Sequence, residues 1–328
     1  MKDVDDALQM AAELFTHVAP DVAPPTKIRE EPLAPPGTVR YEVRTPEGPF
    51  RLKITVDPVQ ASGLLRGSAL LPALAAHGIP APARVAARSR LRGSELTASI
   101  ETLLGTTSGV VAWTFLGAGG RTALAEEAAR SLLLLHRLAL DDLPAIAPPQ
   151  PLPPSHGRPW RDVVASRSER LLERLRGGGL FRATLLDAIR DRHRHDVEQM
   201  PADLERRPCH GQFELNALGV QQRVFAGLRD FEGACAGDPW MDVAHFLGST
   251  ADPLGNPAKR FFSTYAAAVR PPADLPARVD LYTSLTVLRA IAYLCEQAPP
   301  GVRGDMVRMT QDWLDSKPIR LDDREIVS

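Results

Sequence analysis

The sequence is poor in the residues that mark several protein classes. It has only 3 cysteines, Cys209, Cys235 and Cys295, an odd and widely spaced set that fits reduced thiols better than a disulfide framework. No Cys/His pairs lie at the spacing of a zinc site, so we expect no structural metal. Aromatic residues make up only 5% of the chain, which predicts a core built from alanine, leucine and valine.

Long apolar runs and an excess of one charge are also missing. No window approaches 18 uncharged apolar residues. The first residues carry Asp3, Asp5 and Asp6 with no apolar run behind a basic stretch. We therefore expect a cytoplasmic protein without a secretory signal or membrane span. A net charge of −1, from 39 Lys+Arg against 40 Asp+Glu, argues against nucleic-acid binding, and the oligomeric state stays open.

Proline is abundant, with 30 among 328 residues, against a background of roughly 5%. Seven of the prolines lie between Pro144 and Pro159, which predicts an extended surface segment. Hydrophobic residues at 44% and charged residues at 24% are ordinary for globular proteins. A chain of this length is expected to form one large domain or two lobes.

Hydrophobic periodicity divides the chain into a β-rich and an α-rich part. In the first part we expect helices at 5–18 and 61–77, a hairpin at 38–45 and 50–56, and further strands at 95–104 and 110–116. In the second part we expect helices at 123–140, 160–175 and 181–198, short strands at 216–220 and 224–228, and then mostly helix. The glycine-containing segment 117–120 is the predicted boundary, which gives an α+β fold with lobes at 1–116 and 117–328.

Two sequence blocks carry the chemistry. The first reads CHGQFELNALGV at 209–220, and the second reads LRDFEGACAGDPWMDVA at 228–244. Together they resemble the aminoglycoside phosphotransferase and choline kinase family. That family has a His-Gly-Asp segment, an Asn five residues after the Asp, an Asp-Phe/Trp-Asp/Glu stretch and a Gly-Asp-Pro tail. The resemblance implies a two-lobed, protein-kinase-like fold, with the ligand held between the lobes.

The resemblance implies roles for residues that match the family pattern. Asp230 matches the aspartate that holds Mg²⁺ on the phosphates, the alternative being a capping or turn carboxylate. Lys53 matches the lysine that contacts phosphate, although a strand lysine is also commonly just solvated. His210 matches the histidine that braces the loop without transferring a proton.

The first block departs from the pattern at the positions that matter most. Gln212 stands where the family has its proton-accepting aspartate, and an amide is a very poor base. Ala217 stands where the family has its metal-binding asparagine and offers no side-chain oxygen. Asn216 lies next to it and replaces it only if the loop is one residue shorter. Glu214 is a candidate substitute base, with a side-chain direction that the sequence does not fix.

The N-terminal lobe departs from the pattern as well. The helix at 61–77 matches the one that supplies an acidic partner for the strand lysine, but Leu65 to Ser68 contain no acid. The turn from Ala34 to Thr38 has one glycine, which makes a poor phosphate cradle. These losses together predict that ordinary phosphoryl transfer is absent.

The primary hypothesis is therefore a protein of phosphotransferase fold that binds a small molecule in its inter-lobe or C-lobe cleft and requires no cofactor. Because the composition suits a GC-rich bacterial genome and the family is associated with antibiotic resistance, sequestration of a drug is one such role. The alternatives are an active kinase that uses Mg²⁺ and ATP through Lys53, Asn216 and Asp230, and a pseudokinase scaffold for a protein partner. Candidate pocket residues are Glu214, Glu232, Trp160, Trp240 and Tyr265, the aromatic ones being alternatively core.

Overall fold

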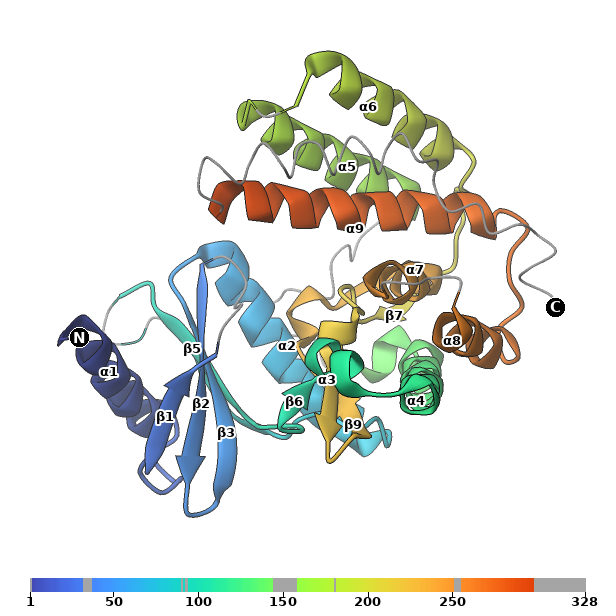
Figure 1. Ribbon diagram of the computed structural model, residues 1–328. Helices are drawn as coiled ribbons and strands as arrows, with labels where there is room; N and C mark the ends of the chain where they lie inside the picture. The colour runs from blue at the N-terminus through green and yellow to red at the C-terminus, as the bar shows by residue number, and fades with distance from the viewer. Residues whose placement is uncertain are drawn as a thin grey trace.

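A five-stranded antiparallel sheet forms the N-terminal part of the protein. The computed structural model describes residues 2–31, 37–89, 91, 94–143, 158–179, 181–250 and 255–297. The strand order is β1-β2-β3-β5-β4, and helix α1 (Lys2–Val18) covers one face (Figure 1). The strands are β1 (Lys27–Glu30), β2 (Thr38–Thr45), β3 (Gly48–Thr55), β4 (Arg84–Arg88) and β5 (Thr97–Thr102).

The period-two alternation of β3 gives the sheet one apolar and one charged face. Leu52 and Ile54 belong to the core that α1 closes, together with Phe15 of that helix. Arg51 and Lys53 alternate with them and therefore point to the opposite face, although both are buried. The sheet thus presents buried cations to the centre of the molecule.

Helix α2 (Pro58–Ala76) links this sheet to the rest of the chain. Its first turn is capped by Asp57, whose carboxylate accepts from Val59 N at 2.7 Å and Gln60 N at 3.1 Å. Gly67 lets the helix approach closely, because a Cβ there would lie 3.0 Å from the carbonyl carbon of Phe231. The helix therefore packs directly against Phe231 and Glu232, near the start of the second motif block.

Two small sheets pack against helix α4 (Ala118–Arg137). One has the order β6-β8-β9, with β6 (Thr107–Ser108), β8 (Leu218–Gln221) and β9 (Val224–Leu228). The other pairs β7 (Arg207–Cys209) with β10 (Cys235–Gly237), and places the free thiols Cys209 and Cys235 opposite each other. The β8–β9 hairpin brings the two motif blocks together.

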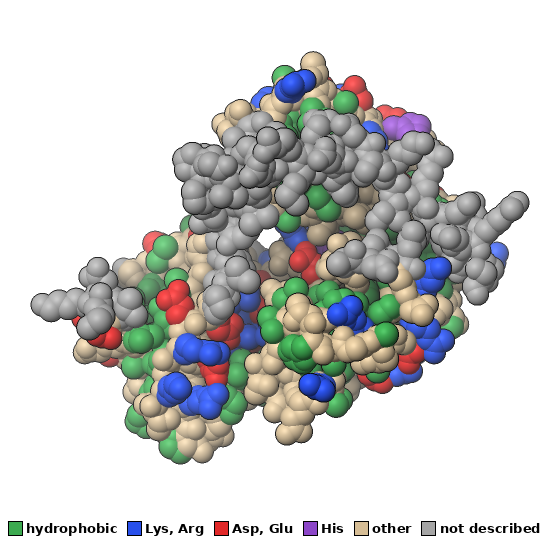
Figure 2. All heavy atoms as spheres, viewed as in Figure 1, with side chains coloured by type: hydrophobic (Ala, Val, Ile, Leu, Met, Phe, Trp, Pro, Cys, Tyr) green, Lys and Arg blue, Asp and Glu red, His purple; other side chains and the backbone are tan. Residues whose placement is uncertain are grey.

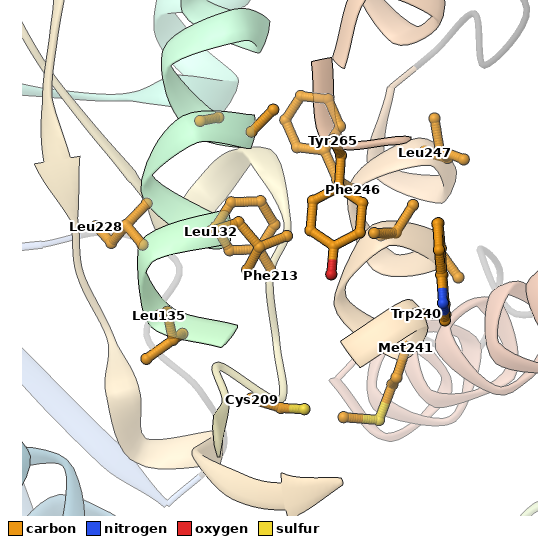
Figure 3. Close-up of a cluster of buried hydrophobic side chains, with 14 of the residues drawn as sticks. Leu132, Leu135, Cys209, Phe213, Leu228, Trp240, Met241, Phe246, Leu247 and Tyr265 are labelled. Atoms are coloured by element: carbon orange, nitrogen blue, oxygen red, sulfur yellow. The ribbon is translucent and has the colours of Figure 1, made fainter. Parts of the chain in front are cut away.

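Helices make up most of the C-terminal part. In Figure 1, α5, α6 and α9 form a layer above α7. Helices α4 and α8 pack against each other at the lower right of the same view. Their bounds are α4 (Ala118–Arg137), α5 (Trp160–Gly177), α6 (Ala183–Glu198), α7 (Pro239–Ser249), α8 (Asn256–Ala266) and α9 (Leu275–Gln297). Figure 3 shows part of the core between these helices, with Leu132 of α4 and Phe246 of α7. In the same core the rings of Phe246 and Phe261 stack with centroids 3.9 Å apart.

The predicted α+β, two-lobed fold is confirmed, with local corrections. The strand expected at 110–116 is wrong: helix α3 (Gly109–Phe115) occupies it, and Ser108 Oγ accepts from Val111 N at 3.5 Å to cap it. Three residues of the predicted boundary segment 117–120 belong to the first turn of α4. Both β6 and α3 precede that boundary but pack on β8, so the division at 116 stays a prediction.

Some expectations fall outside the described residues. These include most of the proline-rich segment, residues 144–157, and most of the turn 34–38. None of the helices that the structure describes is long and apolar enough to cross a membrane.

Candidate functional site

A cavity of about 730 Å³ lies between the sheet with α2 on one side and the C-terminal helices on the other. The surface in Figure 2 is hollowed between these two parts, and side chains of both charges lie in the hollow. Side chains from β2, α2, α5, α7, α9 and both motif blocks line it. Its charged and polar lining residues are Thr38, Arg40, Gln60, Arg66, Arg167, Arg170, Arg174, Gln212, Glu214, Asn216, Asp230, Glu232, His245, Tyr282, Thr286 and Arg289.

The first motif block is held by Asp242, a fully buried residue of α7. Its carboxylate accepts from the backbone of His210 at 2.6 Å and of Gly211 at 2.8 Å. The His210 ring is also buried and donates from Nε2 to Arg229 O at 2.8 Å. These bonds tie the two blocks to each other and to α7, which fixes the loop that carries Gln212.

Asp242 also lies beside His136 and Cys209, a trio with metal-ligand chemistry. All three groups already have partners: His136 contacts Asp242 Oδ2 at 3.1 Å and Tyr265 Oη at 2.7 Å, and the Cys209 thiol donates to Arg207 O at 3.3 Å. Burial raises the pKa of the Cys209 thiol well above its usual value, so it stays protonated. Hydrogen bonds within the core therefore account for all three side chains.

The degenerate positions of the first block all line the cavity. Gln212 and Asn216 are exposed there, while Ala217 is only 3% exposed and contributes a methyl group. Glu214 is partly buried and forms an ion pair with Arg289 of α9. The cavity wall therefore has an amide where the family has its base, and the acid nearest in sequence, Glu214, is already paired.

Lys53 lies within a buried network of charged side chains. Its Nζ contacts Glu232 at 2.6 Å, Glu101 at 2.8 Å and Asp230 at 3.1 Å, and its side chain is 2% exposed. Burial alone would lower the pKa of Lys53, but the three carboxylates outweigh it and raise the pKa. The lysine is a fully paired cation joining the sheet to the second block.

Asp230 sits among four cations. Besides Lys53, its oxygens contact Arg40 at 3.2 Å, Arg51 at 3.6 Å and Arg229 at 3.6 Å. Burial alone would raise the pKa of Asp230, but Arg40, Lys53 and Arg51 hold it well below its usual range. Asp230 also has a φ of 66°, an uncommon left-handed conformation for a residue other than glycine.

The partner of Lys53 was missed by the sequence reasoning. Helix α2 has no acid near Leu65, as the sequence shows, but Glu101 of β5 and Glu232 after β9 pair with the lysine instead. Gly63 and Gly67 of α2 leave room for the backbone of Glu232. The register of β3 with β5, which places Lys53 opposite Ser99 and Arg51 opposite Glu101, is the signal that pairs these charges.

The three aromatic residues proposed for the pocket lie elsewhere. Trp160 is 1%, Trp240 4% and Tyr265 0% exposed, and none of them lines the cavity. Trp160 Nε1 donates to Tyr282 Oη at 2.8 Å, and Trp240 packs edge-on against Tyr265 with centroids 5.1 Å apart. These rings belong to the core: Tyr265 also hydrogen-bonds to buried His136, and Trp240 is held by its ring contacts.

The comparisons with known proteins agree with this architecture. The model of the phosphotransferase enzyme family matches residues 37–282, three quarters of the chain. No curated protein sequence matches.

Several solved structures are similar in fold. A GDP and kanamycin complex of APH(2")-IIia is 14% identical, with a TM-score of 0.73 over 94% of this chain and 99% of that chain. A thermostable mutant of aminoglycoside phosphotransferase APH(4)-Ia in apo form is 15% identical, with a TM-score of 0.67 over 89% and 94% of the two chains. A streptomycin–ATP ternary complex of APH(2")-IIa is 16% identical, with a TM-score of 0.64 over 94% and 96%.

Identities this low show the fold alone. The family model and the two motif blocks, joined by the β8–β9 hairpin at one cavity, carry the assignment further. The chain belongs to the phosphotransferase enzyme family and has the kinase-like fold of the aminoglycoside phosphotransferases.

Proposed function

We propose that this protein binds a small molecule in the cavity between its lobes and has lost, or nearly lost, phosphoryl transfer. The observation that carries the proposal is the state of Asp230 and Lys53. In a kinase of this fold these two groups serve the metal and the phosphates. Here they are neutralised by each other and by neighbouring charges of the same network.

The residues present do not fit a magnesium ion. Mg²⁺ requires oxygen ligands in a near-octahedral arrangement, drawn from carboxylates, phosphates and water. Asp230 is the carboxylate at the matching position, and four cationic side chains already contact it. Ala217 has no side-chain ligand atom, and its backbone oxygen already accepts from Arg229 N at 2.9 Å. A divalent cation would have to displace these cations, which is electrostatically costly in a buried site.

The residues present do not fit proton abstraction either. General-base catalysis is worth roughly 10²–10⁴-fold where it operates, and Gln212 cannot supply it. Glu214 is the acid nearest in sequence, and its carboxylate already forms an ion pair with Arg289. With neither a metal site nor a base, the cavity is left with binding as its chemistry.

Steady-state kinetics tests this proposal. The full-length protein is incubated with ATP, Mg²⁺ and a panel of alcohol acceptors that includes kanamycin and streptomycin, next to an Asp230→Asn variant. We expect no acceptor-dependent ADP release above the background of the variant. Turnover that depends on both an acceptor and Asp230 would refute the loss of phosphoryl transfer.

One observation favours the second candidate, an active kinase with non-standard ligands. Asn216 is exposed on the cavity wall, and the backbone bond from Arg229 N to Ala217 O at 2.9 Å extends the β8–β9 register toward Asn216 and Asp230. Asn216 and Asp230 therefore line the same cavity from the two motif blocks, and Asn216 carries an amide oxygen. Mg²⁺-dependent ATP binding that is lost in an Asn216→Ala variant would support this candidate.

A further inference from the structure

Arginine side chains from helices α2 and α5 line the cavity. Arg167, Arg170 and Arg174 follow one another on α5 at positions i, i+3 and i+7, so they share one face of that helix. Arg66 of α2 lines the cavity as well. The cavity thus has a cationic wall, which we define as Arg66, Arg167, Arg170 and Arg174.

Most of this wall lacks a counterion within the described part of the chain. Other cavity arginines are neutralised, Arg289 by Glu214 and Arg40 by Asp230. In contrast, Arg66, Arg167 and Arg170 form no ion pair with any carboxylate that the structure describes. Arg167 is held by softer contacts, with Met241 Sδ at 3.8 Å and the ring of Trp160 at 5.3 Å. These contacts orient its guanidinium without cancelling its charge.

Only part of the Arg66 guanidinium is hydrogen-bonded within the described structure. One of its terminal nitrogens donates to the backbone oxygen of Glu232 at 2.8 Å, whereas its buried Nε has no hydrogen-bond partner in the described structure. Burial lowers the pKa of Arg66, and the nearby positive charge of Arg167 lowers it further. Two like charges face each other where water is partly excluded, an arrangement that an intervening anion would stabilise.

We propose that the cationic wall binds a small molecule bearing two or more anionic groups, either phosphate esters or carboxylates. Guanidinium groups match the planar, two-oxygen geometry of both groups. This inference rests on the proposed function, because it names the class of ligand that the cavity holds. A polycationic aminoglycoside is disfavoured at the same wall, because its ammonium groups would face these arginines.

Calorimetric titration of the full-length protein tests this inference. The probes are inorganic pyrophosphate, citrate and kanamycin, each titrated at low salt into the wild type. The same titrations are made with Arg66→Gln, Arg167→Gln and the more exposed Arg170→Gln variant. Arg161→Gln is the matched control, because Arg161 lies on the same helix, contacts Asp162 at 3.8 Å and does not line the cavity. Circular dichroism identifies any variant that does not fold, and Arg170→Gln then carries the test.

We expect pyrophosphate or citrate to bind, and the preferred probe to indicate phosphate or carboxylate recognition. Each variant of the cationic wall should weaken that binding about tenfold or more, as expected for loss of a charge-assisted hydrogen bond, while Arg161→Gln leaves it unchanged. The inference is overturned if neither anion binds, or if the control weakens binding as much as the wall variants. Binding of kanamycin alone would overturn it while leaving the binding function intact. Acceptor-dependent ATP turnover would refute that function separately.

Discussion

Replacing Lys53 by methionine distinguishes a structural charge network from a nucleotide site. Lys53 contacts three carboxylates at 2.6, 2.8 and 3.1 Å and is 2% exposed. A pair of opposite charges about 3 Å apart interacts by roughly 6 kcal/mol at an effective dielectric constant of 20, before the cost of desolvation. Methionine keeps most of the volume of the side chain and removes its charge.

The network is balanced, so the substitution leaves one buried negative charge in excess. Its anions are Glu31, Glu101, Asp230 and Glu232, and its cations are Arg40, Arg51, Lys53 and Arg229. Removing one partner of a buried ion pair costs about 3–5 kcal/mol. Since Arg51 lies 3.8 Å from Glu101 and Arg40 lies 4.0 Å from Glu232, partial compensation places the expected loss of unfolding free energy near 3 kcal/mol.

Urea denaturation followed by circular dichroism measures this loss. Lys27→Met is the control, because Lys27 is an exposed lysine on β1 of the same sheet, and a change within about 0.5 kcal/mol is expected there. Adding Glu101→Gln to Lys53→Met restores the charge balance and should recover part of the loss. A Lys53→Met protein as stable as the Lys27→Met control would refute the structural role of the network.

Three further predictions follow from the described contacts. Burial lowers the pKa of His193 to about 4 and that of His245 to about 3. Both stay neutral in the fold while the unfolded chain takes up protons near pH 6.5, so stability is full above pH 7 and falls as the pH drops. At pH 5 each neutral histidine costs about 2 kcal/mol of unfolding free energy. His193→Gln should therefore reduce the difference in urea stability between pH 7.5 and pH 5 by about 2 kcal/mol; an unchanged difference would contradict this. Gly67→Ala should lower the unfolding free energy by about 1–3 kcal/mol, because the added Cβ would meet the rigid backbone of Phe231. Gly119→Ala on α4 is the control: the space around Gly119 is open, so this substitution should raise the unfolding free energy by about 0.5–1 kcal/mol. Equal effects of the two substitutions in a denaturation assay would be inconsistent with close packing of α2. The double substitution Gln212→Asp and Ala217→Asn should not produce acceptor-dependent ATP turnover, because Asp230 keeps its four cations; kinase activity in this variant would show that the loss lies in these two positions alone.

Much of the architecture was predictable because it depends on local patterns. The alternation in β3 that places Leu52 on one face and Lys53 on the other is visible in the sequence. The spacing of the two motif blocks likewise predicted that they meet, because a short hairpin joins them. The run at 110–116 misled because its valines favour strand, while the Ser108 cap and its position beside β8 favour the helix.

The charge environment of the site was less accessible from sequence. Glu101 is 48 residues from Lys53 in the chain, and only the pairing of β3 with β5 brings it into reach. The arginines of α5 have the spacing of an ordinary solvated helix face, and the cavity becomes apparent only when α2 and α9 are placed around them. Trp160 and Trp240 were ambiguous because a large aromatic residue serves a pocket or a core equally well until its polar atom finds a partner.

Calorimetric titration of Mg-ATP into the full-length protein tests most directly whether the cavity still binds the nucleotide and metal that phosphoryl transfer requires. Asp230 and Lys53 pair with each other in a buried charge network, and Ala217 offers no side-chain ligand atom. We therefore expect no Mg²⁺-dependent heat of ATP binding in the wild type and no difference in an Asp230→Asn variant that remains folded. Tight binding that requires both Mg²⁺ and Asp230 would contradict this and favour the alternative, a kinase that uses ATP and Mg²⁺.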